Sequence, residues 1–65
     1  MVVDGVHYKV VWKKFIVGSS FFIPCIHTKI AKKEVKETMR ILGMKVVMKL
    51  VIENEIRGLR IWRVR

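Results

Sequence analysis

The last third of the chain, residues 45–65, constrains the fold most strongly, because apolar and charged residues alternate along it. Alternation with a period of two, rich in β-branched residues, is typical of strands with one buried face. The polar run Glu53-Asn54-Glu55 divides two such stretches and predicts a turn between them. We therefore expect a β-hairpin. The apolar face of its first strand would consist of Val46, Met48, Leu50 and Ile52.

The strand that returns from this turn admits two registers. Gly58 is a candidate for a bulge, which would change the side chains that face the core. In the register that we favour, Leu59 and Ile61 point to the core. Arg60, Trp62 and Val64 then lie on the outer face. The reverse assignment would bury Trp62 instead.

Two further strands are expected in the first part of the chain. Residues 6–14 alternate again, with aromatic and β-branched residues on one face. Gly18-Ser19-Ser20 is a turn signal, and residues 21–23 form a short apolar strand after it. Pro24 ends that strand, because proline cannot donate a hydrogen bond to a sheet. These two strands are expected to form a second hairpin.

Between the hairpins, residues 29–42 have the spacing of an amphipathic helix. Thr28 is expected as its N-cap, and Gly43 is expected to end it in the left-handed conformation. One side is an apolar stripe of Ala31, Val35, Met39 and Leu42, flanked by Ile30 and Ile41. The other side, which we call the basic ridge, consists of Lys29, Lys32, Lys33, Lys36 and Arg40.

The order strand, strand, helix, strand, strand predicts one small α+β domain over residues 1–65. Its ββαββ arrangement would form a four-stranded antiparallel sheet with a single helix packed on one face. Such sheets can leave their other face in water. The hydrophobic fraction of 52% exceeds the usual range of roughly 45–50%. More apolar surface than one small core can bury favours a homodimer.

The charge of the chain favours a polyanionic partner. Fourteen lysine and arginine residues against five acidic ones give a net charge of +9. A field of this size attracts nucleic acid, an anionic membrane surface or an acidic protein. On the outer sheet face, the expected nucleic-acid-binding residues are Lys9, Lys13, Lys45, Lys49, Arg60 and Trp62. On the basic ridge they are Lys32, Lys36 and Arg40, together with Lys29.

No arrangement of residues predicts catalysis, a cofactor or a bound metal. His7 and His27 stand alone, whereas a general base needs a positioned partner and a metal site needs several ligands. Cys25 is the only cysteine, so we expect a buried thiol and a reducing, cytoplasmic location. The most apolar run, residues 15–26, is shorter than the roughly 20 residues that cross a bilayer. We expect neither an enzyme nor a membrane protein.

Three segments carry a resemblance: VGSSFFIP (17–24), MRILGMKVVMKL (39–50) and GLRIWRVR (58–65). They resemble short bacteriophage-encoded proteins that share a Gly-acid-Ser-Phe-Phe-aliphatic-Pro segment and a terminal Gly-aliphatic-Arg-aliphatic-Trp-Arg. Ser19 stands here where those proteins have an acidic residue. The resemblance implies a phage or prophage origin, the bacterial host cytoplasm as location, and a role in host takeover or phage gene regulation.

Two functions thus compete. The first is a nucleic-acid-binding protein with a regulatory or accessory role. The second is a phage inhibitor, of the anti-CRISPR kind or similar, that binds a host enzyme or defence complex. Val11, Val47 and Val51 on the outer sheet face would suit such a protein contact. A membrane-surface role is less favoured, because the apolar stripe of the helix is needed for the core.

Overall fold

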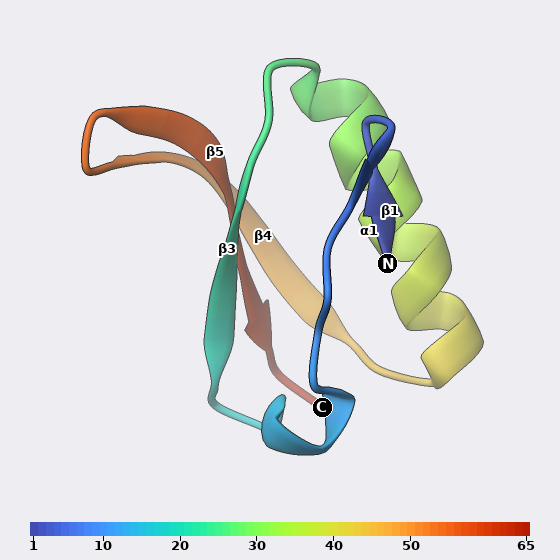
Figure 1. Cartoon of the computed structure of the whole chain (residues 1–65). Coiled ribbons are helices and arrows are strands. Elements are labelled where there is room, and N and C mark those ends of the chain that lie inside the picture. The colour runs from blue at the N-terminus through green and yellow to red at the C-terminus, as the bar shows by residue number, and fades with distance from the viewer.

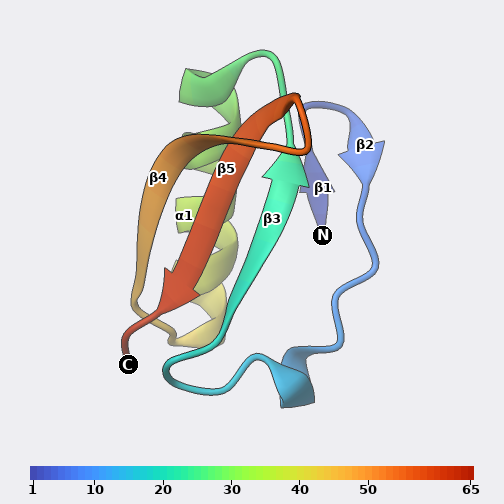
Figure 2. The ribbon, with the colours of Figure 1, turned by 90° about the vertical axis from the view of Figure 1, so that its left-hand side faces the viewer.

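The structure is a computed structural model that describes all residues, 1–65, and it confirms a small α+β domain (Figure 1). In chain order the elements are β1 (Val2–Val3), β2 (Val6–His7), the 3₁₀ helix η1 (Trp12–Lys14), β3 (Ser20–Pro24), α1 (Thr28–Leu42), β4 (Val46–Glu53) and β5 (Ile56–Arg63). The helix α1 packs on one face of the main sheet, and the opposite face stays open (Figures 1 and 2). None of the helices has the length and apolar character needed to cross a membrane.

The main sheet has three antiparallel strands in the order β3-β5-β4. The last strand of the chain is thus the central one. It pairs with β4 from Val46↔Arg63 to Glu53↔Ile56, and with β3 from Ser20↔Trp62 to Pro24↔Gly58. Both registers run one to one through Gly58, so the candidate bulge does not form there.

The favoured register of β5 is confirmed. Leu59 and Ile61 are fully buried beneath α1, and Arg60 and Trp62 lie half-buried on the outer face. Along the paired β4 strand, Met48 lies opposite Ile61 and packs against the core.

The rest of the β4 inner face is not buried as the alternation predicts. Leu50 and Ile52 are 46% and 73% exposed. The β4–β5 hairpin curves away from α1 toward its turn, so the helix does not cover this end (Figure 1). The predicted turn itself is confirmed, and its two central residues, Asn54 and Glu55, adopt left-handed φ angles of 51° and 66°. Two successive left-handed residues are typical of the tight turns that suit the twist of a hairpin.

The helix closely matches its prediction at the C-terminal end. Gly43 adopts a φ of 70°, and its amide donates to the carbonyl of Arg40. The amide of Met44 donates to the carbonyl of Met39 at 2.9 Å, which satisfies a second orphan carbonyl. At the other end, Thr28 is already inside the helix, so the predicted N-cap is wrong. The cap residue is His27, which makes no side-chain capping hydrogen bond.

The apolar stripe of α1 is buried along most of its length. Ala31, Val35 and Met39 are at most 2% exposed, whereas Leu42 in the last turn is 41% exposed. The flanking Ile30 and Ile41 are exposed.

The long strand predicted over residues 6–14 is wrong. Only Val6 and His7 form a strand, and they pair with β1 in a separate two-stranded hairpin. Residues 12–14 form η1 instead of strand. The partner expected for this segment, β3, pairs with β5, and this pairing continues beyond the strand ends through the hydrogen bond from Arg63 N–H to Ser19 O.

The alternation of the N-terminal segment nonetheless has a structural reason. Val3 and Phe15 are buried in the core, and Tyr8 and Trp12 pack against it. The rings of Phe15 and Phe21 meet edge to face at 4.8 Å between centroids. The segment runs beside α1 on the inner side of β3 and reaches the core without joining the sheet (Figures 1 and 2). Thus α1 and the N-terminal segment together cover the inner face, except at the turn end of the β4–β5 hairpin.

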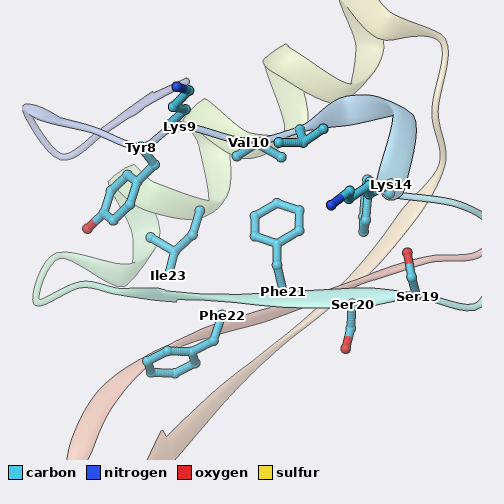
Figure 3. A pocket seen from close by; sticks show the side chains of 11 residues that line it. Tyr8, Lys9, Val10, Lys14, Ser19, Ser20, Phe21, Phe22 and Ile23 are labelled. Carbon is cyan, nitrogen blue, oxygen red and sulfur yellow. The ribbon is translucent and has the colours of Figure 1, made fainter.

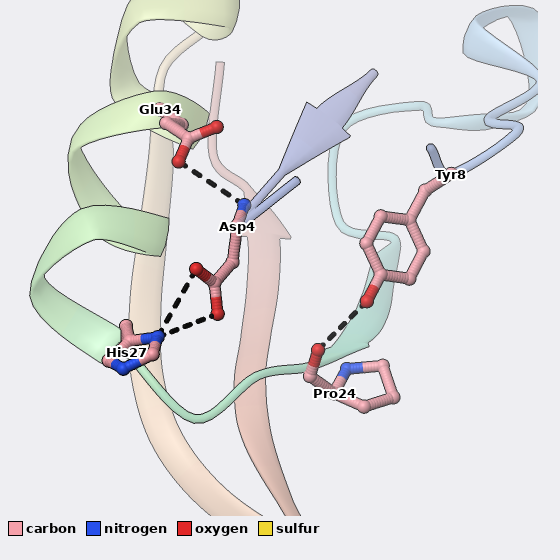
Figure 4. Close-up of polar contacts among 5 residues, drawn as sticks. All are labelled: Asp4, Tyr8, Pro24, His27 and Glu34. Atoms are coloured by element: carbon pink, nitrogen blue, oxygen red, sulfur yellow. Dashed lines mark hydrogen bonds and ion pairs between the residues drawn. The ribbon is translucent and has the colours of Figure 1, made fainter. Parts of the chain in front are cut away.

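Polar contacts fasten this segment to its neighbours (Figure 4). The Asp4 carboxylate contacts Nδ1 of His27 at 3.1 Å, and the Asp4 amide donates to Glu34 Oε1 at 3.2 Å. The hydroxyl of Tyr8 donates to the carbonyl of Pro24 at 2.9 Å. The first two contacts hold the β1–β2 turn against α1, and the third holds residue 8 against the end of β3.

Candidate nucleic-acid interface

The basic ridge lies on the side of α1 that faces away from the sheet. Its members are exposed, apart from Lys32, which is half-buried. They line a shallow groove together with one acidic residue, Glu37. At about 1.5 Å per residue, the ridge runs roughly 16 Å along the helix from Lys29 to Arg40. The helical spacing thus brings five cations onto one strip of surface.

Only one of these cations is engaged by a carboxylate. Arg40 donates from Nε to Glu37 Oε2 at 3.1 Å and also from its terminal nitrogen to Oε1. This side-chain hydrogen bond lowers the pKa of Glu37 and raises that of Arg40. The three ion pairs of the chain include none of the ridge lysines. Their charges are therefore free to meet an external anion.

The position of the lysines near the start of α1 is electrostatically unfavourable for the helix. The N-terminal end of a helix has a partial positive charge, which favours acidic side chains there and disfavours basic ones. The first turn of α1 contains no acidic residue, and Lys29, Lys32 and Lys33 all fall in its N-terminal half. A bound anion at this end of the ridge would relieve both the dipole and the repulsion between lysines.

The outer sheet face mixes charge with aromatic and aliphatic groups. One row across the strands contains Lys49, Arg60 and Phe22, and the next contains Val47, Trp62 and Ser20. The Nε of Arg60 lies 3.4 Å from Oε2 of Glu53, so part of the positive charge is compensated. This face is therefore less cationic than the sequence predicts.

Phe22 is a member of this face that the sequence did not reveal. Phe21 and Phe22 project from opposite sides of β3 (Figure 3). The Phe22 ring lies over Gly58, where an added Cβ would come within 2.7 Å of Cζ of the ring and 2.3 Å of the Ile23 carbonyl oxygen. Glycine therefore lets β3 and the ring approach β5 closely. Residues 21–23 are all apolar, so no alternation could show which of them faces outward.

Lys9 and Lys13 do not lie on the sheet, so this part of the predicted interface is wrong. Lys9 belongs to the irregular stretch after β2, and Lys13 belongs to η1. The error follows from the strand that residues 6–14 do not form. Lys45 lies at the margin of the outer face, where its carbonyl accepts from the amides of Val64 and Arg65.

The predicted residues thus form three separate groups. The basic ridge holds Lys32, Lys36 and Arg40; the outer sheet face holds Lys45, Lys49, Arg60 and Trp62; the N-terminal segment holds Lys9 and Lys13. The sheet separates the first two groups, which face opposite ways (Figure 2).

A pocket of about 320 Å³ lies between the N-terminal segment and the free edge of β3 (Figure 3). Two of its four aromatic members, Phe15 and Phe21, form the edge-to-face pair described above. Lys9 and Lys14 are both exposed and contribute to its lining. The pocket marks the gap that remains because residues 8–11 run beside β3 without pairing with it.

The remaining reactive side chains are one cysteine and two histidines. Cys25 is 7% exposed, and burial raises the pKa of its thiol, which keeps it protonated. The predicted buried thiol is thus confirmed. His7 and His27 are both exposed. No three histidine, cysteine, aspartate or glutamate side chains gather as a metal site would require.

Comparisons with protein-family models, with curated proteins and with solved structures gave no match.

Proposed function

We propose that this chain is a small basic nucleic-acid-binding protein that holds the phosphate backbone of DNA or RNA against the basic ridge of α1. One observation carries the proposal: Lys29, Lys32, Lys33 and Lys36 line one exposed side of a helix without a single carboxylate partner. Lysines that neutralise phosphates release condensed counterions, and this release drives binding.

The length of the ridge suits a polyanion. Over roughly 16 Å a DNA duplex carries about ten phosphate charges, at about one per 1.7 Å of axis. Several ridge lysines can therefore contact phosphates at the same time. A single small anion would engage only part of the ridge.

The chemistry of the ridge favours binding without sequence preference. Base readout relies on bidentate donors and acceptors such as arginine, asparagine and glutamine. The ridge has no asparagine or glutamine, and its one guanidinium, that of Arg40, is engaged by Glu37. Lysine contacts to phosphate position a protein on nucleic acid but carry no sequence information.

The outer sheet face supports a second contact, specific for unpaired bases. Trp62 and Phe22 are half-buried there, beside Lys49 and Arg60. Proteins commonly bind single strands with exposed aromatic side chains next to cations. The bases stack on the aromatic rings, and the phosphates contact the cations. Because this face and the ridge point in opposite directions, a short duplex would occupy the ridge alone.

The second candidate function, an inhibitor that binds a host protein, also rests on the outer sheet face. Val47 and Ile56 are 46% and 50% exposed there, around the Arg60–Glu53 pair. Apolar groups among charges suit a protein contact. The resemblance to phage proteins gives both candidates a setting in the bacterial cytoplasm, as phage gene regulation or as host takeover.

The test measures binding of the whole chain to random-sequence single- and double-stranded DNA and RNA. Fluorescence anisotropy at two salt concentrations gives the affinities. We expect submicromolar affinity at low salt, with a steep loss as salt rises. Absence of binding even at low salt would contradict the proposal. If the chain then captured one specific bacterial protein, and added nucleic acid did not displace that protein, the inhibitor hypothesis would be favoured.

A further inference from the structure

The strand β4 has an unpaired edge eight residues long. In an antiparallel pair, successive residues turn their backbone groups alternately toward and away from the partner strand. The amide of Val64 donates to the carbonyl of Lys45, so the odd-numbered residues of this stretch turn their backbone groups toward β5. The backbone groups of Val46, Met48, Leu50 and Ile52 therefore point away from β5, and none of them bonds to another part of the chain.

This edge lacks the features that usually protect one. It contains no proline and no bulge, and its only basic residue is Lys49. Beside it lies a groove lined by Leu50, Val51, Ile52 and Arg57. Leu50 and Ile52 are the apolar residues that α1 leaves exposed. Free backbone groups and uncovered apolar side chains thus coincide at one place.

The charges on the outer side of β4 also lack one partner. Lys49 lies directly opposite Arg60, and like charges in that position repel. Glu53 compensates Arg60 at 3.4 Å. Lys49 has no carboxylate of its own. A carboxylate on the open side of the strand would complete the row.

We propose that a second copy of the chain occupies this edge, with the two β4 strands antiparallel and a twofold axis at Val51. In this register Leu50 lies opposite Ile52 of the partner subunit, and their outward backbone groups pair. Lys49 lies opposite Glu53 of the partner subunit, so each copy supplies the carboxylate that the other lacks. Sliding the partner by two residues in one direction would place Lys49 opposite Val51, and sliding by four would place it opposite another lysine. Sliding by two in the other direction would place it opposite Glu55, which lies in the turn beyond β4.

The dimer would be one continuous six-stranded sheet. Because the axis is perpendicular to the sheet, both α1 helices would lie on the same side, and the two outer faces would merge on the other. The basic ridge is then doubled on one side of the assembly. Dimer formation itself does not depend on nucleic acid, so it can be tested in its absence.

A cysteine at the axis tests the register. Facing residues that are not hydrogen-bonded to each other have Cα atoms about 4.5 Å apart, within the range of about 4.4–6.8 Å that disulfides span. Val51→Cys, in a Cys25→Ala background, should therefore form an intermolecular disulfide under mild oxidation. Val47→Cys is the matched control: it lies on the same face of the same strand, but its two copies would be about 27 Å apart at about 3.4 Å per residue. No cross-link at position 51, or equal cross-linking at both, would overturn the proposal.

Charge variants test the pairing in solution by sedimentation equilibrium. The unmodified chain should sediment at twice its 7.7 kDa. Glu53→Lys and Lys49→Glu should each weaken the dimer about tenfold or more, because two attractive pairs become repulsive. The double swap should restore it, and it still leaves a carboxylate opposite Arg60. A monomer at every concentration, or a dimer indifferent to these charges, would contradict the proposal. Circular dichroism would show whether each charge variant is folded. If one is not, the comparison of Val51→Cys with Val47→Cys tests the proposal instead.

Discussion

The basic ridge of α1 and the outer sheet face are both cationic, but they differ in what surrounds each charge. On the ridge four lysines stand free, and the single carboxylate nearby engages Arg40. On the sheet Arg60 is compensated by Glu53 and lies among Trp62, Phe22 and aliphatic side chains. The ridge offers charge alone, whereas the sheet offers apolar contact with some charge.

This difference separates two kinds of partner. Free lysines on an exposed helix suit phosphates, whose attraction acts at a distance and falls as salt rises. A half-buried aromatic among aliphatic groups suits a stacked base or a protein, whose contact is short-range and less sensitive to salt. Substitutions on each surface in turn can show whether the two divide in this way.

The largest effect is expected from reversing charge on the ridge. Lys32→Glu/Lys36→Glu should weaken binding to duplex DNA about a hundredfold at moderate salt, because two phosphate contacts are lost and repulsion replaces them. Anisotropy with a random duplex measures the effect.

Lys9→Glu/Lys13→Glu is the matched control, since it changes the net charge equally at two exposed residues outside both surfaces. It should cost only a few-fold. Equal losses in the two double variants would mean that total charge, and not the ridge, determines binding. Such a result would also indicate that Lys9 and Lys13 contact the nucleic acid.

A second prediction concerns the packing that shapes the outer face. Gly58→Ala should lower the free energy of unfolding by about 2–3 kcal/mol, because the added Cβ meets a backbone oxygen as well as the Phe22 ring. Urea denaturation measures the loss. Combining it with Phe22→Ala should not restore stability, since the contact with the Ile23 carbonyl remains. Full tolerance of alanine would show that β3 does not approach β5 as closely as described.

The third prediction separates single strands from duplex. Trp62→Ala should weaken binding to single-stranded DNA about tenfold, the low end for a stacked base because the ring is partly buried. It should leave duplex binding unchanged. Trp12 packs against the core on the inner side of the sheet. In a Trp12→Phe variant, Trp62 would be the only tryptophan, and its fluorescence would report on contacts at the outer face. An unchanged single-strand affinity would assign the outer face to a protein partner.

The smallest effect is expected at the acidic residue of the ridge. The hydrogen bond from Arg40 lowers the pKa of Glu37, so this carboxylate is ionised at neutral pH and remains so in mild acid. Glu37→Gln should therefore strengthen duplex binding about two- to threefold at neutral pH, by freeing one cation. In the unmodified chain the same gain should appear only as the pH falls far enough to protonate Glu37. Weaker binding by this variant would show that the carboxylate positions Arg40 for its contact.

The ridge and the β4–β5 hairpin could be predicted because their signals are local. Helical spacing places the lysines on one side, Gly43 ends the helix, and alternation around residues 53–55 defines the turn. Alternation left two registers for the returning strand, and the one-to-one pairing through Gly58 is what turns Leu59 and Ile61 inward.

The N-terminal segment and the outer face could not be predicted in full, because they depend on distant pairing. Alternation over residues 6–14 predicts the core contacts of Tyr8 and Trp12, but it wrongly buries Val6 and does not show whether the backbone joins a sheet. That outcome depends on β3 pairing with β5 rather than with its neighbour in sequence. Lys9 and Lys13 were misplaced for this reason, and the packing of Phe22 on Gly58 requires the same pairing.

The salt dependence of duplex binding tests the ridge most directly. The slope of log affinity against log salt counts the phosphates neutralised, at about 0.9 per contact. Lys32→Gln/Lys36→Gln should lower this slope by about 1.8 relative to the unmodified chain, whereas Lys9→Gln/Lys13→Gln should leave it nearly unchanged. An unchanged slope in the first variant would show that the ridge does not contact the phosphates.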